Sequence, residues 1–423
     1  MSDPIAKTEA YLDAIAAENP RLNAFVRVTD DLARHQAASV ADEAALRGWC
    51  VAVKDNIDVA GVMTSNGLPG GVVPEADAPV IARLKAAGAI ILGKTNLHEA
   101  ALGSTTDNAH WGWTHNPLRH GYTAGGSSGG SAAAMAAGLC DAALGSDTMG
   151  SVRVPAGHCG LVGFKPTFDA IPCEGVAPLC WALDHVGPIT KTVADARAMF
   201  VALADPVEPV SALEKPRLVK LSAFEALPLE PAVAAAYAES LRRIEALYGP
   251  IETVDLPGFD PIALRRAALL VIEADAAAIH ADRFADFSPG LRRMLEYGAK
   301  LSAPRLALAL EQVRQARKAI VGLLRQVDAI VSPTTAMTAF PLDGQHPPGH
   351  SDFMGLAVFA GAPAISVPMP MAAGELPAGL QLIAASGRDL ALLDWAEAIH
   401  LIVRASYSEK LTAIAIQFDR KML

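Results

Sequence analysis

The chain has 423 residues, of which 52% are hydrophobic and 19% charged, and its formal charge is −10 at pH 7. This composition is typical of a core-rich globular protein and excludes a disordered chain. Because nucleic-acid binding needs a basic face, the acidic balance argues against a nucleic-acid partner.

Five cysteines are odd in number and show no C-x-x-C spacing: Cys50, Cys140, Cys159, Cys173 and Cys180. We therefore expect no disulfide framework, no metal site and a cytoplasmic location. The N-terminus lacks the pattern of a signal peptide, and no run of 18 apolar residues is free of charge. We expect no contact with a membrane.

Helical and strand-like patterns alternate over the first half of the chain. The compact apolar run Trp49–Val53 predicts a strand that carries Lys54 at its tip. Residues 103–131 are dense in Gly, Ser and Thr and are expected to contain little regular structure. The other expected helices are 4–17, Asp30–Ala45, Val80–Ala87, Ser131–Ala137 and Thr192–Ala204, and the other expected strands are Ala24–Val28, Ala89–Leu92 and Ala142–Leu144.

The second half begins after a proline-rich stretch, Asp205–Pro216, which is the best linker candidate. Strands are expected at Arg217–Leu221, Ile251–Val254, Ala329–Val331 and Ala364–Val367, with helices at Pro231–Leu247, through most of 261–327, and near Leu390–Val403. The pattern favours one mixed α/β domain over residues 1–423, with residues 205–325 as a helical elaboration. The tail after Arg404 has no assignment.

Two short motifs match familiar patterns, and their context argues against both. Gly88–Thr95 fits G-x-x-x-x-G-K-T, but its central Ala-Ile-Ile-Leu is a buried strand rather than a flexible phosphate-binding loop. Gly125–Gly129 fits G-x-S-x-G, yet no apolar strand precedes it, as a nucleophile elbow requires. We expect neither a nucleotide site nor an α/β-hydrolase.

Three polar side chains have the chemistry of a proton relay. Ser127 and Ser151 both lie on turns that contain glycine, and such turns allow two serines to face each other. Lys54 follows an apolar strand, so partial desolvation should lower its pKa and allow it to act as a base, although Asp55 and Asn56 should limit the shift. The residues alone do not establish the pairing.

A longer match supplies it. The stretch "GGSSGGSAAAMAAGLCDAALGSDTMGSVRVPAGHCGLVGFKPT" at residues 125–167 resembles the amidase signature, the Gly/Ser-rich core of amidohydrolases with a Ser–cis-Ser–Lys triad. The segments "VAVKDNIDVAG" (51–61), "GKTNLHEAALG" (93–103), "LDHVGPITKTVADA" (183–196), "IVSPTT" (330–335) and "GAPAISVPM" (361–369) follow in the family's order. The resemblance covers most of residues 10–400 and implies a large mixed β-sheet flanked by helices on both faces.

By this resemblance, Ser151 is the nucleophile, Ser127 the bridging serine after a cis peptide bond, and Lys54 the base. The backbone N–H groups of Thr148, Met149, Gly150 and Ser151 would hold the oxyanion. The family has glycine where this chain has Met149, so that side chain, together with Ala101, is expected to line the acyl pocket.

Neighbouring residues have simpler expected roles. Ser128 and Ser131 should bond locally and cap the following helix. Asp147 and Arg153 should hold the nucleophile turn, and Cys159 should be packed rather than reactive. The histidines at 110, 115 and 120 do not share a helical face, so they are expected to be structural and not metal ligands.

The resemblance favours an amidohydrolase that cleaves a small-molecule carboxamide, or a related urea or carbamate, without a cofactor. A homodimer is compatible with the sequence. Two alternatives stay open. One is the amidase subunit of a glutamine-dependent tRNA amidotransferase, disfavoured because the chain has "SVRVPA" in place of "SIRQPA" and no evident basic surface. The other is a non-catalytic binding protein on the same fold.

Overall fold

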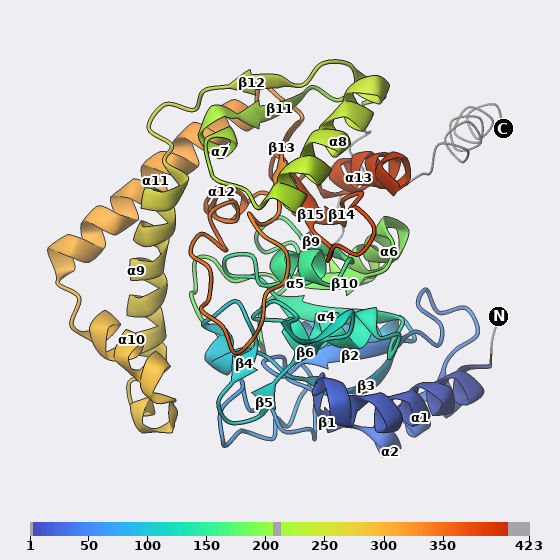
Figure 1. Ribbon diagram of the computed structural model, residues 1–423. Coiled ribbons are helices and arrows are strands. Elements are labelled where there is room, and N and C mark those ends of the chain that lie inside the picture. The colour runs from blue at the N-terminus through green and yellow to red at the C-terminus, as the bar shows by residue number, and fades with distance from the viewer. Residues whose placement is uncertain (1–2, 206–212, 405–423) are drawn as a thin grey trace.

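A computed structural model describes residues 3–205 and 213–404. Its centre is a mixed sheet of 11 strands (Figure 1). In spatial order the strands are β1 (Phe25–Val28), β3 (Ile90–Thr95), β2 (Cys50–Lys54), β8 (Ala142–Ser146), β10 (Val186–Thr190), β9 (Val162–Lys165), β14 (Ala364–Pro368), β15 (Gly379–Ala384), β13 (Ala329–Pro333), β11 (Leu218–Leu221) and β12 (Glu252–Val254).

The strands are apolar on both faces, which explains why they are buried along their whole length. In β2, Val51 and Val53 join one hydrophobic cluster, whereas Cys50 and Ala52 join the cluster on the opposite face. Successive side chains of a strand point to opposite faces. Lys54, two residues after Ala52, therefore points to the same face as Cys50 and Ala52.

Helices cover both faces of the sheet, so the expected fold class is confirmed. One face packs against four helices: α3 (Pro79–Ala86), α6 (Val193–Leu203), α8 (Pro231–Tyr248) and α13 (Asp389–Arg404). The other packs against α1 (Pro4–Leu22), α2 (Asp30–Ser39) and α4 (Gly129–Ala136) at one end and, at the other, α5 (Arg153–His158), α7 (Ser222–Glu225), α9 (Pro261–Ile279), α10 (Pro289–Ala299), α11 (Ala303–Leu324) and α12 (Gly355–Ala360).

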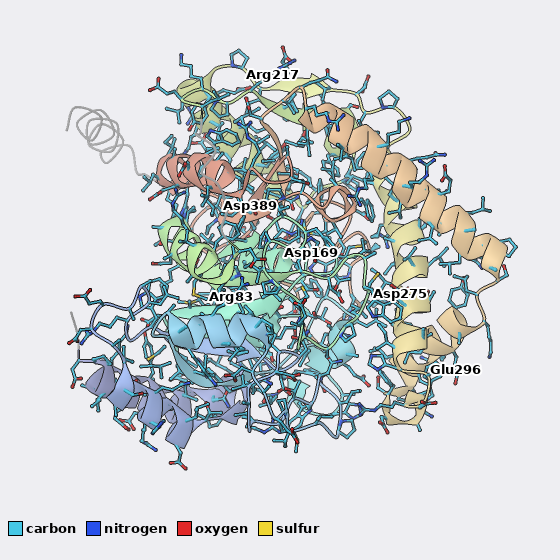
Figure 2. All side chains as sticks on the ribbon, turned by 180° about the vertical axis from the view of Figure 1, so that it is seen from behind. Arg83, Asp169, Arg217, Asp275, Glu296 and Asp389 are labelled. Carbon is cyan, nitrogen blue, oxygen red and sulfur yellow. The ribbon has the colours of Figure 1, made fainter. Side chains whose placement is uncertain are left out.

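Helices α9, α10 and α11 form an arm along one side of the molecule, far from α1 and α2 (Figure 1). Viewed from behind, Asp275 and Glu296 lie along this arm, while Arg217 lies at the β11–β12 edge (Figure 2). Segment 205–325 thus combines the helical arm with two strands of the main sheet. In the described ranges, no helix has both the length and the apolar character needed to cross a bilayer.

Several boundaries differ from the sequence prediction. The helix expected over Asp30–Ala45 ends at Ser39, because the following segment turns back to pair, with Leu46 N–H donating to the Ala87 carbonyl. The segment 103–131 contains two small ribbons: β4 (Asp107–Asn108) with β5 (Gly112–Trp113), and β6 (His115–Asn116) with β7 (Arg119–Thr123). Most of the expected linker and the tail after Arg404 lie outside the described residues.

Candidate active site

Lys54 ends strand β2 with its side chain wholly buried on the α4 face of the sheet. Its Nζ donates to Ser127 Oγ at 2.7 Å and to Ser146 Oγ at 2.8 Å. Asn56 Nδ2 donates to the same Ser146 hydroxyl at 3.0 Å. The strand therefore delivers Lys54 to Ser127, and the sequence prediction had missed Ser146 and Asn56 as its neighbours.

The environment of Lys54 favours the neutral amine. Burial lowers the pKa of Lys54 to about 7, while the charges of Asp147 and Asp184 act in the opposite direction. The adjacent Asp55, expected to limit the shift, instead pairs with buried Lys94 at 3.1 Å. An amine that is partly deprotonated near neutral pH can accept a proton from a hydroxyl.

Ser127 lies fully buried in the turn before α4, and the peptide bond between Gly126 and Ser127 is cis. The next residue connects this turn to the second one, since Ser128 N–H donates to the Ser151 carbonyl at 3.2 Å. The structure thus brings Lys54, Ser127 and the Ser151 turn together from segments almost 100 residues apart.

The prediction that Ser128 and Ser131 cap α4 is wrong. Ser128 Oγ donates to the Ser146 carbonyl at 3.2 Å, and Ser131 Oγ donates to the Leu144 carbonyl at 3.0 Å. Thr106 Oγ1 takes the capping position by accepting from Gly129 N–H at 3.1 Å. Because α4 packs directly on β8, both serine side chains satisfy strand carbonyls instead of the helix end.

The turn that carries Ser151 is held by a buried ion pair. Asp147 accepts from Gly150 N–H at 2.6 Å and from Val152 N–H at 3.2 Å, and Arg153 donates to both of its oxygens at 3.0 Å. Burial acts to raise the pKa of Asp147, but the charge and hydrogen bonds of Arg153 hold it well below its usual range. This geometry agrees with the turn-holding role expected for Asp147 and Arg153.

Gly150 is required by the shape of this turn. Its φ is +104°, and a Cβ built there would lie 2.5 Å from Met354 Cγ. Its N–H is already bound to Asp147, so it does not join the oxyanion donors as predicted. Within the described residues, the N–H groups of Thr148, Met149 and Ser151 carry no hydrogen bond, which leaves three donors beside the Ser151 hydroxyl.

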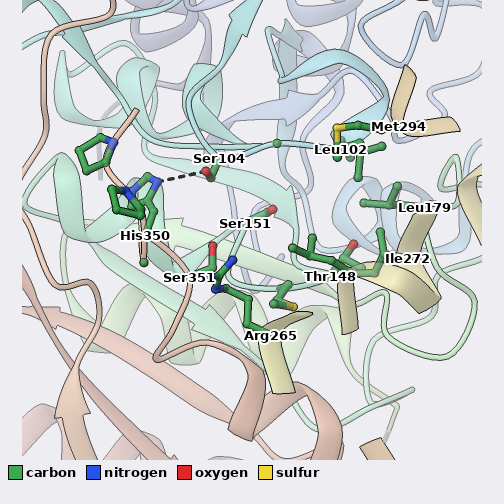
Figure 3. A pocket seen from close by; sticks show the side chains of 17 residues that line it. Leu102, Ser104, Thr148, Ser151, Leu179, Arg265, Ile272, Met294, His350 and Ser351 are labelled. Atoms are coloured by element: carbon green, nitrogen blue, oxygen red, sulfur yellow. Dashed lines mark hydrogen bonds between the residues drawn. The ribbon is translucent and has the colours of Figure 1, made fainter. Parts of the chain in front are cut away.

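A cavity of about 260 Å³ opens above Ser151 (Figure 3). Lys54 and Ser127 are completely buried behind it, whereas Ser151 is 8% exposed. Ala101, Thr148 and Met149 line the same cavity, in agreement with the pocket positions expected for Ala101 and Met149. Its apolar wall also includes Leu102, Leu179, Leu269, Ile272 and Met294.

Two polar features of the cavity have no signal in the sequence motifs. Arg265, on α9, points its guanidinium toward the Ser151 side of the cavity and is held by Asp352 through its Nε (Figure 3). His350 lines the cavity as well and contacts Ser104 Oγ through Nδ1 at 3.0 Å. Its Nε2 lies 3.3 Å from Nε2 of His158. Arg265 and His350 come from segments that carry no transferable pattern.

The remaining expectations concern structural side chains. His115 and His120 stack with ring centroids 4.0 Å apart, while His110 contacts Glu99 at 3.0 Å, so the three histidines do not converge. In the part of the chain that the structure describes, no group of three or more potential ligands is placed to hold a metal. Cys159 is packed in the core, where burial raises its pKa, as predicted.

The fold and this arrangement are those of one enzyme class. The family model described as Amidase matches residues 6–393, and the chain belongs to this family, the amidase signature enzymes, which act on C–N amide bonds.

Among its relatives is the amidase-family subunit of the glutamyl-tRNA(Gln) amidotransferase of Synechococcus sp. strain RCC307, 35% identical over 89% of each chain. The corresponding subunit from Thermotoga maritima superposes with a TM-score of 0.82 at 31% identity, over 94% of this chain and 91% of that one. A structure described as an amidase has a TM-score of 0.87 at 31% identity, over 95% and 96%.

These relatives overturn two predictions. The assignment as a stand-alone amidohydrolase of a small carboxamide is wrong, because curated relatives from several organisms are amidotransferase subunits that match about nine-tenths of the chain. The expected absence of a nucleic-acid partner is wrong for the same reason, since those subunits belong to an enzyme that acts on a glutamyl-tRNA. The net charge of one chain does not describe the surface of such an assembly.

Proposed function

We propose that this chain is the amidase subunit of a glutamine-dependent tRNA amidotransferase. It hydrolyses the side-chain amide of glutamine, and the released ammonia is used to amidate a glutamyl-tRNA bound by the rest of the complex. The observation that carries the proposal is the 35% identity to the corresponding subunit of such an enzyme over 89% of both chains.

The geometry suits an acyl-enzyme mechanism. Neutral Lys54 accepts a proton from Ser127, which in turn deprotonates Ser151 as its Oγ attacks the amide carbon. The N–H groups of Thr148, Met149 and Ser151 face the developing oxyanion. Ser127 returns the proton to the departing nitrogen, ammonia leaves, and water hydrolyses the glutamyl ester of Ser151 to glutamate.

Arg265 provides a site for the charged end of glutamine. The substrate must place its amide at Ser151 and its α-carboxylate some distance away in the same cavity. Arg265 faces that cavity, and only its Nε is engaged, by Asp352. The other guanidinium donors can bind a carboxylate in the fork geometry that arginine favours.

One position departs from the pattern expected of such a subunit. Val154 stands where the "SIRQPA" segment has glutamine, and it is buried in the apolar cluster beside the Ser151 turn. The polar recognition of glutamine is therefore assigned to Arg265 on α9, on the other side of the cavity, rather than to the segment after Ser151.

The test uses the purified chain combined with the other amidotransferase subunits of the same organism and glutamyl-tRNA. Conversion to glutaminyl-tRNA should occur with either glutamine or ammonium chloride as nitrogen donor. The Ser151→Ala complex should lose the reaction with glutamine and keep it with ammonium. Failure of the wild-type complex with glutamine, or equal glutamine use by the variant, would disprove the proposal.

A further inference from the structure

A second cavity of about 500 Å³ adjoins the active-site cavity. It lies between residues 227–230, the first turns of α9, and the segments 336–337 and 348–353. The two cavities share Arg265, Pro348 and Gly349 as a common wall. A molecule held in the second cavity would therefore touch a side chain that also faces Ser151.

The second cavity is amphipathic. Leu229, Met337 and Phe353 form an apolar floor, and none of them presents a polar side-chain atom. Glu230 lies at one edge, but its carboxylate is occupied by the backbone N–H and the hydroxyl of Thr338, at 2.8 and 3.1 Å. The acidic group at this edge is thus turned toward the protein.

The basic groups are less satisfied. Arg266 is exposed at the cavity and makes no hydrogen bond or ion pair with any residue in the described ranges. Arg265 is bound only by Asp352, which leaves its terminal nitrogens available. Two adjacent arginines over an apolar floor match a ligand that carries one negative charge on an apolar body.

We propose that this second cavity binds a small amphiphilic carboxylate, held by Arg266 and Arg265, and that its occupancy weakens substrate binding at Ser151. The coupling follows from the shared wall, because a carboxylate in the second cavity draws the Arg265 guanidinium away from the active-site cavity. Binding at either site then disfavours binding at the other by the same factor. This site goes beyond the proposed function, since direct binding requires no turnover.

The experiment titrates the intact protein calorimetrically with 4-phenylbutyrate and with 4-phenylbutanol, its uncharged counterpart. The acid should bind more tightly than the alcohol. Arg266→Ala should weaken acid binding by about threefold to tenfold and leave alcohol binding unchanged, as expected for one partly exposed charge contact. Ile262→Glu, at the exposed rim of the cavity, should act in the same direction. Arg325→Ala, an exposed arginine at the end of α11, is the matched control.

Amide hydrolysis in the presence of the acid adds a second measurement. The acid should raise KM with little change in kcat, and Arg266→Ala should abolish this effect while its basal activity stays unchanged. Equal affinity for acid and alcohol, or acid binding that is insensitive to both Arg266→Ala and Ile262→Glu, would overturn the proposal. Calorimetric binding is measured even if glutamine is not the substrate, so the two proposals fail separately.

Discussion

Two fully buried lysines near the site share the same low basicity. Burial lowers the pKa of both Lys54 and Lys165 to about 7. Lys54 contacts the Ser127 hydroxyl, whereas Lys165 Nζ donates to the Pro166 carbonyl at 2.8 Å. Only one of them is placed to move a proton toward Ser151, and this difference makes the base testable by pH.

We predict that kcat/KM for amide hydrolysis rises with pH through a limb centred near 7. The active form is the neutral amine of Lys54, and its fraction grows as pH rises above that pKa. Lys54→Met should reduce the rate by several orders of magnitude and remove the limb. Lys165→Met, checked for folding by thermal melting, should keep it. A limb that persists in the Lys54 variant, or disappears in the Lys165 variant, would identify a different base.

Arg265 is the residue for which specificity is predicted. Arg265→Met keeps the apolar stem and removes the charge, so KM for glutamine should rise by about tenfold to a hundredfold, the range for a hydrogen bond to a charged group. Steady-state kinetics with propionamide, which has no carboxylate, provides the comparison and should show little change. If both amides were affected equally, Arg265 would be shaping the cavity rather than binding a carboxylate.

At the scale of an element, the Ser151 turn depends on the pair between Asp147 and Arg153. Arg153 is wholly buried and also donates to Gln381 Oε1 at 2.6 Å, which connects the turn to strand β15. Arg153→Met should lower the free energy of unfolding by about 3–5 kcal/mol, because Asp147 is left as an unpaired buried charge. Denaturant unfolding would measure this, and Asp147→Asn combined with Arg153→Met should recover part of the loss. A loss below about 1 kcal/mol would mean that solvent reaches the pair.

Helix α4 is positioned by a close approach at its first turn. A Cβ on Gly130 would lie 2.4 Å from the Asn96 carbonyl oxygen and 2.5 Å from that of Ala24, and backbone atoms cannot move aside cheaply. Gly130→Ala should destabilise the protein by about 1–3 kcal/mol and reduce activity by shifting the Ser127 turn.

The contrasting position is Gly322 in α11, where a Cβ would meet nothing within 4 Å. Gly322→Ala should stabilise the protein by about 0.5–1 kcal/mol without changing activity. Thermal melting of the two variants compares them directly. The packing account of α4 would be wrong if both substitutions were stabilising.

Sequence reasoning reached the elements whose signals are local. The apolar run before Lys54 and the Gly/Ser turns are readable because strand burial and turn chemistry depend on neighbouring residues. Arg265, Asp352 and His350 were missed because they enter the cavity only after α9 and the segment before α12 fold over Ser151. Gly150 was predicted as an oxyanion donor because the sequence does not show which N–H group Asp147 accepts from.

For the molecule as a whole, Asp141 joins the N-terminal helix to the sheet. Its carboxylate accepts from Tyr11 OH at 2.8 Å and from Cys50 N–H at 2.7 Å, and it pairs with Lys7 at 2.7 Å. Asp141→Ala should cost about 1–3 kcal/mol, because the Cys50 N–H loses its partner. Hydrogen exchange should show faster opening of α1 while the Ser151 region stays protected. Uniform loss of protection would show that α1 does not open independently.

The pairing of β9 with β14 has a consequence during synthesis on the ribosome. Strand β9 ends at Lys165, and its partner on one side, Ala364–Ser366, is translated about 200 residues later. At roughly 5–20 residues per second, the nascent chain carries an open apolar strand edge for about 10–40 seconds. Since such edges recruit other strands, the growing polypeptide should depend on chaperones in this interval, and slow codons between residues 170 and 360 should lower its yield more than slow codons after residue 384.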